Sequence, residues 1–254
     1  MARLSDQEFL RYNRHVMVDK IGEEGQIKLA SAHVLIIGLG GLGCPASQYL
    51  AASGVGRLSL MDNDHIELSN LQRQILFTQQ DIGKAKVEIA KQRLEAINPL
   101  IQIDALPVSV LKANIQALLR SVTLVLDCTD SAETRHFINR ACIQAKVKLV
   151  SASAIQGQGQ VIGFDFSTTD SPCYACLFPE TAETARNCAT SGVLSPLLGV
   201  MGSLQATEAI KLLMGKTEGL NRLTSFDAWG LNFKQFNISK NGNCRACNRA
   251  HLTK

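Results

Sequence analysis

The sequence predicts an α/β protein built on a doubly wound, Rossmann-like sheet that is mostly parallel and is extended by antiparallel strands near the C-terminus. Three observations support this fold class. Apolar segments of strand length alternate with helical patterns through residues 33–155. A G-x-G-x-x-G turn, residues 38–43, directly follows the first strand pattern. The segments 223–227 and 233–238 have strand patterns with no helix between them, as expected of antiparallel neighbours.

The N-terminal segment 5–30 is predicted to be helical, because charged and apolar residues alternate at helical spacing. Ser5 followed by Glu8 is the pattern of a capping box at a helix start. This segment leads to the first strand, 33–38. From its position alone, Arg14 is expected to be a solvated charge on a helix surface.

The elements after the glycine turn alternate regularly. A helix leads from the turn to a second strand, 58–62, which a polar loop follows. We then expect alternating helices and strands at residues 83–97, 101–106, 110–120, 123–130, 131–145 and 148–153. This alternation predicts parallel strands with helices on both faces of the sheet.

The C-terminal part has a different character. Residues 157–166 predict a strand in a β-hairpin, and the polar stretch 180–191 predicts a loop. Residues 193–214 predict a pair of apolar helices broken near Gly199 or Gly202. No internal repeat or linker-like tract interrupts the sequence, so we expect a single domain over residues 1–254.

The composition excludes several classes of protein. The formal net charge is only +4, and lysine and arginine are dispersed, so we expect no nucleic-acid partner. No signal-peptide core is present, and no apolar run approaches the roughly 18 residues of a spanning helix. We therefore expect a cytoplasmic protein without a membrane partner, in which the eight cysteines stay reduced.

The glycine turn predicts a nucleotide site. Residues without Cβ let the backbone turn tightly and approach phosphates at a helix N-terminus. Asp62 ends the second strand, where an acid accepts hydrogen bonds from ribose hydroxyls. Taken alone, this pattern fits NAD or FAD as well as ATP, and it also fits a simple tight turn.

Charged residues near the turn favour nucleotidyl transfer over hydride transfer. Arg73 and Lys86 follow the second strand, and Asp130 lies at the tip of a later strand. Cations stabilise the charge that develops when a carboxylate attacks the α-phosphate of ATP, and an aspartate can hold the accompanying Mg²⁺. The alternatives are a helix N-cap for Asp130 and an NAD-dependent oxidoreductase for the protein.

Two Cys-x-x-Cys motifs predict a structural zinc site. Cys173 and Cys176 form one, and Cys244 and Cys247 form the other. Each turn directs two thiolates toward one ion, and together they supply the four soft ligands of a tetrahedral Zn²⁺. Four protein ligands leave no open position, so this ion should fasten the C-terminal tail to the sheet rather than catalyse.

Several motifs together resemble one family. They are Gly38-Leu-Gly-Gly-Leu-Gly43, Ser69-Asn-Leu-Gln-Arg-Gln74, Gly83-x-x-Lys86, Asp127-Cys-Thr-Asp130, the two Cys-x-x-Cys motifs and residues 199–211. Over nearly the whole chain this set resembles the ThiF/MoeB (HesA/MoeB/ThiF) family, bacterial relatives of the ubiquitin-activating enzymes. The resemblance implies a homodimeric adenylyltransferase that uses ATP and Mg²⁺. Its substrate would be the C-terminal Gly-Gly carboxylate of a ubiquitin-like sulfur-carrier protein, and pyrophosphate would be released.

The resemblance also assigns roles to residues. It implies that Arg14, within Arg11-Tyr-Asn-Arg14, reaches the ATP of the neighbouring subunit. It implies a nucleotide-binding half, 33–155, after the helical segment 1–32, and a carrier-binding and zinc half, 156–254. The implied nucleotide contacts are Gly41, Asp62, Asp64, Ser69, Asn70, Leu71, Gln72, Arg73, Lys86, Asp130 and Ser131.

The role of Cys188 and the biosynthetic pathway that the carrier serves each have two interpretations. Cys188 matches a loop cysteine that joins the carrier covalently in ThiF-like members and is dispensable in MoeB-like members. The opening sequence resembles molybdopterin-synthase activators, whereas Gln74-Ile-Leu-Phe-Thr, Phe178-Pro and the segment around Cys188 resemble thiamine-thiazole ones. We favour a ThiS-type carrier slightly over a MoaD-type carrier. Sulfur is expected from a separate cysteine desulfurase or sulfurtransferase.

Overall fold

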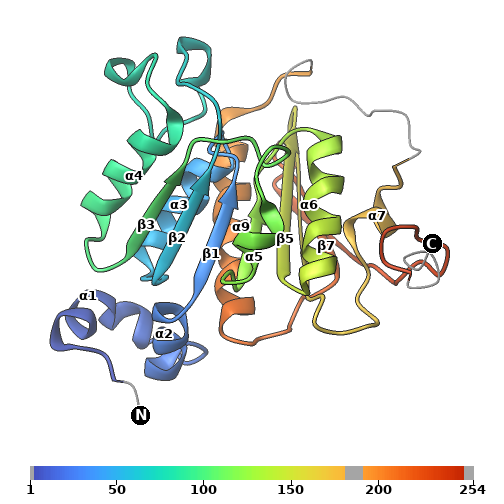
Figure 1. Ribbon diagram of the computed structural model, residues 1–254, viewed down its shortest axis with the longest axis horizontal. Helices are drawn as coiled ribbons and strands as arrows, with labels where there is room; N and C mark the ends of the chain where they lie inside the picture. The colour runs from blue at the N-terminus through green and yellow to red at the C-terminus, as the bar shows by residue number, and fades with distance from the viewer. Residues whose placement is uncertain (1–2, 181–190, 249–254) are drawn as a thin grey trace.

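A computed structural model describes residues 3–180 and 191–248 of the chain (Figure 1). Its centre is an eight-stranded sheet with the order β3-β2-β1-β4-β5-β6-β7-β8. The strands are β1 His33–Ile37, β2 Arg57–Met61, β3 Gln102–Leu106, β4 Leu124–Asp127, β5 Lys148–Ile155, β6 Gln158–Phe164, β7 Arg222–Asp227 and β8 Asn232–Asn237. Strands β1 to β5 pair in parallel, and β6, β7 and β8 are added in antiparallel orientation. The predicted fold class is confirmed.

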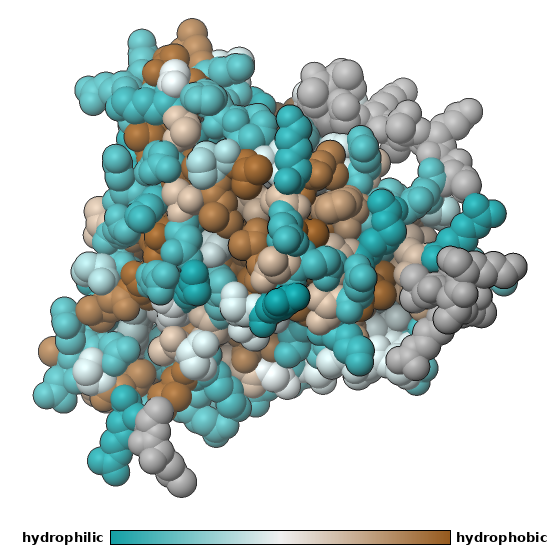
Figure 2. All heavy atoms as spheres, viewed as in Figure 1, coloured by the Kyte–Doolittle hydropathy of each residue, from teal (hydrophilic) through white to brown (hydrophobic). Residues whose placement is uncertain are grey.

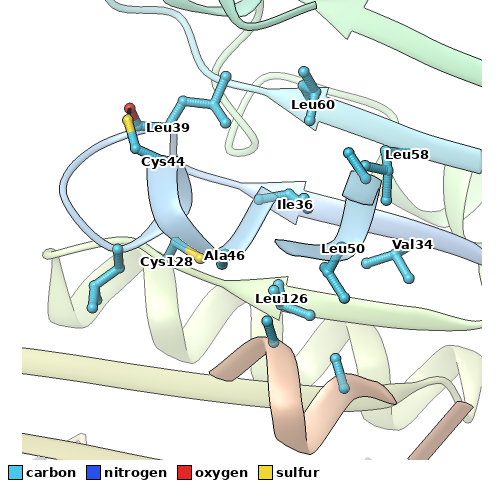
Figure 3. Close-up of a cluster of buried hydrophobic side chains, with 14 of the residues drawn as sticks. Val34, Ile36, Leu39, Cys44, Ala46, Leu50, Leu58, Leu60, Leu126 and Cys128 are labelled. Carbon is cyan, nitrogen blue, oxygen red and sulfur yellow. Dashed lines mark hydrogen bonds between the residues drawn. The ribbon is translucent and has the colours of Figure 1, made fainter. Parts of the chain in front are cut away.

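Strand β1 lies at the centre of the parallel part. All five of its residues are buried, because helices cover both faces of the sheet. Ile36 pairs with Leu60 of β2 on one side and with Leu126 of β4 on the other. Figure 3 shows these apolar side chains gathered beside the helix that follows the glycine turn. This packing holds the end of β1 in place, and the glycine turn begins there.

Two layers of helices enclose the sheet (Figure 1). One layer holds α3 Gly43–Ala52, α4 Lys86–Ile97 and α9 Ser195–Leu213. The other holds α5 Ile115–Leu119, α6 Ala132–Ala145 and α7 Tyr174–Leu177. Two short 3-10 turns, η1 Leu68–Asn70 and η2 Gln79–Asp81, lie in the loop after β2. No helix in the described part of the chain is long and apolar enough to cross a bilayer.

The N-terminal segment forms two helices, α1 Asp6–Val16 and α2 Gly22–Ala30. The capping box of Ser5 and Glu8 is present, as predicted. The buried ring of Tyr12 anchors α1, and its hydroxyl accepts a hydrogen bond of 2.8 Å from Asn98 Nδ2. Asn98 directly follows α4 and precedes β3. Helix α1 therefore lies at the edge of the sheet where the parallel strands begin.

The predicted pair of helices over residues 193–214 is wrong, because this segment forms one helix, α9, that is continuous over 19 residues. A glycine weakens a helix by about 1 kcal/mol but need not break it when packing compensates. A Cβ on Gly202 would lie 2.5 Å from Pro45 Cγ and 2.6 Å from Leu42 O, so this glycine lets α9 approach α3 closely. Gly199 has no neighbour within 4 Å of the corresponding position.

Two other helices begin later than predicted. Helix α4 begins at Lys86 rather than at Gly83, whose φ of +86° is incompatible with a helix. Helix α5 begins after Asn114 rather than at residue 110. Asn114 is the N-cap, and its side chain accepts a hydrogen bond of 3.3 Å from Ala117 N. In both cases the boundary is set by a residue that favours non-helical backbone.

The side of the molecule seen in Figure 2 has a mixed surface. Hydrophilic side chains are spread among hydrophobic ones over the sheet and its helices. Figure 2 shows no single hydrophilic field on this side. The candidate site is therefore located from the sheet topology rather than from this surface.

Candidate functional site

The candidate site lies at the carboxyl ends of β1, β2 and β4, which are neighbours in the sheet. Chain connections leave β1 toward β2 on one side, whereas β4 flanks it on the other, so the crevice between β1 and β4 is a topological switch point. The glycine turn follows β1 here. Gly38 has a φ of +91°. A Cβ on Gly43 would lie 1.9 Å from Gly38 O, so only glycine fits at residue 43.

Asp62 ties the glycine turn to the loop after β2. Its Oδ2 accepts a 2.7 Å hydrogen bond from Leu39 N, within the turn, and its Oδ1 accepts a 2.8 Å bond from Asp64 N. The carboxylate is half-buried beside the turn. The predicted position at the end of the second strand is confirmed, and ribose binding stays a prediction.

Lys86 and Asp64 form an ion pair in the site. Lys86 Nζ lies 2.9 Å from Asp64 Oδ2, and the main-chain N–H of Lys86 donates to Asp64 O at 3.0 Å. The Lys86 side chain is buried and that of Asp64 is exposed. A buried ammonium requires an anionic partner. Asp64 supplies one here, and a phosphate could replace it at the same position.

The motif segment 69–73 forms the turn around η1. Asn70 is buried, and its Oδ1 accepts a 3.3 Å hydrogen bond from Glu67 N. Arg73 Nη1 donates to Ser69 O at 3.0 Å, which folds the guanidinium over the turn. Leu71 packs against the core, whereas Ser69 and Gln72 are exposed. The turn is therefore pre-organised by its own hydrogen bonds, with Arg73 on its rim.

Asp130 lies on the loop between β4 and α6. Strand β4 ends at Asp127 rather than at residue 130, so Asp130 is three residues beyond the sheet. Its carboxylate is exposed, and it has no hydrogen bond or ion pair to any described residue. The alternative reading of Asp130 as the N-cap is wrong, because Ser131 is the N-cap of α6 and accepts from Thr134 N. A free carboxylate at this edge suits an oxygen-preferring cation.

Gly41 lies under the first turn of α9. A Cβ on Gly41 would lie 2.5 Å from Leu198 Cδ1, and Leu198 is buried. A side chain at residue 41 would therefore push α9 away from the glycine turn. The contact with Leu198 explains why residue 41 is a glycine. The contact of the Gly41 backbone with a nucleotide stays a prediction.

Gln74 belongs to the site but was not among the predicted contacts. Its side chain is buried, and its Oε1 has no hydrogen-bond partner within the described residues. Its Nε2 lies 3.8 Å from the Cβ position of Gly40, so the amide borders the glycine turn. A buried polar atom without a partner is costly. Gln74 is the last residue of the Ser69–Gln74 motif, and this position could have identified it as a site residue from the sequence.

Arg14 lies away from this site within its own chain. It is exposed on α1 and has no ion pair or hydrogen bond to a described residue. Helix α1 packs at the edge where the parallel strands begin, whereas the glycine turn lies where they end (Figure 1). Arg14 therefore lies at the opposite end of the parallel strands from the glycine turn of its own chain.

The four cysteines of the two motifs come together, as the spacing predicted. Their sulfur atoms all lie within 4.8 Å of one another. The separations are 3.8 Å for Cys173 and Cys176, 3.7 Å for Cys173 and Cys244, and 3.5 Å for Cys176 and Cys247. A tetrahedral zinc ion with Zn–S bonds of about 2.3 Å separates its sulfurs by about 3.8 Å. The geometry suits a metal ion and not disulfides, which need about 2.05 Å.

The surroundings of the cysteines favour a thiolate. The hydrogen bond with Cys173 lowers the pKa of Cys176 to about 4, and Asn241 N donates to Cys176 Sγ at 3.4 Å. The same hydrogen bond raises the pKa of Cys173, and the side chain of Asn139 opposes this rise. Asn139 is fully buried, and its Nδ2 lacks a hydrogen-bond partner of ordinary length among the described residues. An amide N–H in this position would stabilise a thiolate that binds a metal.

The remaining cysteines differ from these four. Cys44, Cys128 and Cys142 are buried, as expected of small hydrophobic residues. Burial raises the pKa of the Cys44 thiol to about 12, which makes it a poor nucleophile. Cys188 lies outside the described residues, so its role stays a prediction.

The site as a whole suits a bound polyphosphate. Its floor is a glycine turn at a helix N-terminus, which favours anions. Arg73 and Lys86 bring positive charge to the same edge of the sheet, and Asp130 presents an exposed carboxylate that suits a cation. Such a site can stabilise charge that builds up on phosphate oxygens.

Comparison with known proteins identifies relatives over almost the whole chain. The model of the ThiF family matches residues 12–246. The chain is 45% identical to a molybdopterin-synthase adenylyltransferase of Escherichia coli, over 97% of this chain and 99% of the relative. It is 43% identical to a sulfur carrier protein ThiS adenylyltransferase of the same organism, over 96% of this chain and 97% of the relative. Among solved structures, E. coli MccB with ATP is 25% identical with a TM-score of 0.78, covering 93% of this chain and 74% of that one.

Proposed function

The chain belongs to the ThiF family, and on this premise we propose that it is an adenylyltransferase of a ubiquitin-like sulfur-carrier protein. It transfers AMP from ATP to the C-terminal Gly-Gly carboxylate of the carrier and releases pyrophosphate. The observation that carries this proposal is the set of groups at the ends of β1, β2 and β4. The glycine turn, Lys86 and the exposed carboxylate of Asp130 all come from segments that follow these strands. The names of the relatives, two of them adenylyltransferases, support the same reaction.

The chemistry requires an anion to attack an anion. The carrier carboxylate attacks the α-phosphorus, the bond to the β-phosphate oxygen breaks, and pyrophosphate leaves with that electron pair. Positive charge near the phosphates lowers the barrier in two ways. It reduces the repulsion between the attacking carboxylate and the phosphates, and it stabilises the negative charge that builds up on the leaving pyrophosphate. Lys86 is the central cation in this proposal, since its buried ammonium can exchange Asp64 for a phosphate oxygen. Arg73 can hold a second oxygen from the rim of the η1 turn.

Asp130 is the proposed holder of Mg²⁺. Its exposed carboxylate, without a partner in the described chain, fits a cation that prefers oxygen ligands. When bound, Mg²⁺ neutralises phosphate charge and orients the triphosphate. Asp62 is proposed to hold the ribose, because its carboxylate borders the glycine turn. The backbone of Gly41 and the Ser69–Arg73 turn enclose the nucleotide in this arrangement, with Ser131 next to Asp130.

We propose that the enzyme is a homodimer in which Arg14 serves the site of the partner. Helix α1 lies at the edge of the sheet opposite the glycine turn, so Arg14 can contribute only from a second copy. An apolar groove of about 770 Å³ between α3 and α9 supports such an association. The exposed side chains of Tyr49, Ile75 and Val200 line this groove. A second copy could cover them and bring Arg14 across.

The four-cysteine cluster is proposed to hold a structural Zn²⁺. The sulfur separations and the stabilised Cys176 thiolate suit this ion. Bound zinc fastens the chain around Cys244 to α7 and thereby to the face of the sheet that α6 covers. Four sulfur ligands leave no position for a substrate, so we assign the metal no step of the reaction.

The carrier is proposed to be of the ThiS type. Short segments around Gln74, Phe178 and Cys188 favour this carrier. The sequence identities of 45% and 43% to the two E. coli enzymes are too close to each other to separate the two pathways. A MoaD-type carrier is the alternative. In a ThiS-type reaction, the Cys188 thiolate would attack the acyl carbon of the acyl-adenylate and release AMP. Alternatively, it would attack the outer sulfur of a persulfide on a separate cysteine desulfurase or sulfurtransferase, whose own thiolate would leave.

The experiment is ATP–pyrophosphate exchange with each purified carrier of the source organism. We expect exchange that needs Mg²⁺ and a carrier, is faster with the ThiS-type carrier, and disappears when the terminal Gly-Gly is removed. Faster exchange with the MoaD-type carrier would reassign the pathway and leave the reaction intact. Absence of exchange with every Gly-Gly carrier would overturn the proposed function.

A further inference from the structure

The loop that carries Asp130 is held by a buried polar cluster. Asp127, the last residue of β4, is 1% exposed. Its Oδ1 accepts hydrogen bonds from Thr129 Oγ1 at 2.7 Å and Thr129 N at 3.1 Å, and its Oδ2 accepts one from Ser151 Oγ at 2.8 Å. These bonds turn the backbone immediately before Asp130. The direction of the loop is therefore set by residues that do not themselves face the site.

Arg135 completes this cluster from α6. Its guanidinium donates to Thr129 O, to Ala152 O at 2.8 Å and to Ser151 Oγ at 3.3 Å, although the residue is only 7% exposed. The contact with Thr129 fixes the carbonyl of the residue before Asp130. Ser151 Oγ lies between the carboxylate of Asp127 and the guanidinium, so the two buried charges compensate each other.

A second set of contacts ties α6 to the cysteine-bearing helix α7. Burial raises the pKa of Tyr174, which follows Cys173, and the nearby guanidinium of Arg135 opposes this rise. Tyr174 N donates a 3.0 Å hydrogen bond to Oδ1 of Asn139, which lies one helical turn after Arg135 on α6. The Tyr174 ring also packs edge-on against His136 at 5.2 Å. Helix α7 therefore contacts α6 at the turn that carries Arg135.

We propose that Arg135 is a positioning residue for magnesium-dependent nucleotide binding. Arg135 does not touch the nucleotide. It sets the backbone from which Asp130 projects, through its hydrogen bonds to Thr129 O and Ser151 Oγ. The inference rests on the proposed role of Asp130 in holding Mg²⁺.

The test is the Mg²⁺ concentration that gives half-maximal ATP binding by the full-length protein, measured by calorimetry without a carrier. Arg135→Lys keeps the charge but cannot reach three acceptors at once. We expect it to raise the midpoint about tenfold, the loss expected for one or two hydrogen bonds of a charged group. Ser151→Ala removes the hydroxyl that accepts from Arg135 and donates to Asp127, and it should shift the midpoint in the same direction. The thermal unfolding midpoint and the Mg²⁺-free binding of AMP are measured in parallel.

Asp130→Asn provides the background that separates the two proposals. If Arg135 acts through Asp130, Arg135→Lys should produce no further shift in an Asp130→Asn protein. An equal shift in both backgrounds, or weaker AMP binding in parallel with the shift, would show a general structural role and overturn the inference. If Asp130→Asn shifts the midpoint and neither other variant does, the inference fails and the proposed function stands. If Asp130→Asn has no effect, the Mg²⁺ role of Asp130 and the inference both fail. Should Arg135→Lys not fold, Ser151→Ala decides by the same criteria.

Discussion

The ammonium of Lys86 lies 2.9 Å from Asp64 Oδ2, with the Lys86 side chain 5% exposed and that of Asp64 60% exposed. The protein has therefore buried a cation against a carboxylate that solvent reaches freely. A bound phosphate can displace such a partner without leaving the lysine unpaired.

Lys86→Met should lower the rate of ATP–pyrophosphate exchange about a hundredfold or more, because the charge that faces the phosphates is removed. Asp64→Asn is the matched variant, since it removes the competing anion and leaves the cation in place. We expect it to change the rate less than tenfold. Equal losses in the two variants would mean that Asp64 itself acts on the nucleotide, against the role of a displaceable partner.

Arg14 should act between subunits. Arg14→Ala and Lys86→Met proteins are each expected to be inactive alone, and a mixture reassembled from equal amounts should regain about a quarter of the wild-type exchange rate. Half of the dimers would be mixed, and each would contain one intact site. The measurement is exchange after subunit reassembly, with each variant alone as the control. No recovery in verified mixed dimers would exclude action in trans.

Removal of metal from the four-cysteine cluster should destabilise the fold around α7. We expect about one zinc ion per chain by elemental analysis, and its removal by a chelator should lower the thermal unfolding midpoint. Cys244→Ser should give the same loss, because it leaves three ligands for the ion. The control is Cys142→Ser, a buried cysteine outside the cluster. A purified native protein with no bound metal and an unchanged midpoint in Cys244→Ser would contradict the assignment.

The two glycines of α9 should respond oppositely to alanine. Gly202→Ala should destabilise the protein by roughly 1–3 kcal/mol, because the new Cβ would meet Leu42 O at 2.6 Å and Pro45 Cγ at 2.5 Å. Gly199→Ala places its Cβ where no described atom of the same chain lies within 4 Å, on the α9 side of the groove. It should stabilise the helix by about 0.5–1 kcal/mol. Urea unfolding of both variants measures the difference, and a reversed order would contradict the close packing of α9 on α3.

Stability should decrease in mildly acidic solution because of His33. Burial lowers the pKa of this imidazole, although its hydrogen bond to Ser121 O opposes the shift. Below its ordinary value of 6.5 the unfolded chain takes up a proton that the folded chain does not. The contribution is therefore complete above pH 6.5 and is lost as the pH falls from there toward the folded pKa.

The measurement is the free energy of unfolding between pH 8 and pH 5. His33→Asn should flatten part of the wild-type decrease. It should not abolish it, because burial also lowers the pKa of His136. An unchanged pH dependence in His33→Asn would remove His33 as a source.

Local patterns in the sequence determined much of this protein. The alternation of strands and helices, the capping box of Ser5 and Glu8, and the glycine turn all depend on residues close together in the chain, so their spacing predicted them. The four cysteines also follow this rule within each motif, because a Cys-x-x-Cys turn places two sulfurs on one side. Positions after predicted strands indicated Arg73, Lys86 and Asp130, and the family resemblance added Ser69, Asn70, Leu71 and Gln72. The sheet order brings the ends of β1, β2 and β4 side by side.

Only the tertiary structure decided which side chains meet. The continuity of α9 depends on the contact of Gly202 with α3, which cancels the local tendency of glycine to end a helix. The place of Arg14 depends on where α1 docks, and the hydrogen-bond partners of Arg135 come from the loop after β4 and from β5. The spacing between Arg135 and Ile138 is that of one helix face, but no local pattern identifies Thr129 or Ser151 as partners of Arg135. Periodicity indicates which face is buried, whereas the identity of each contact depends on how distant segments pack together.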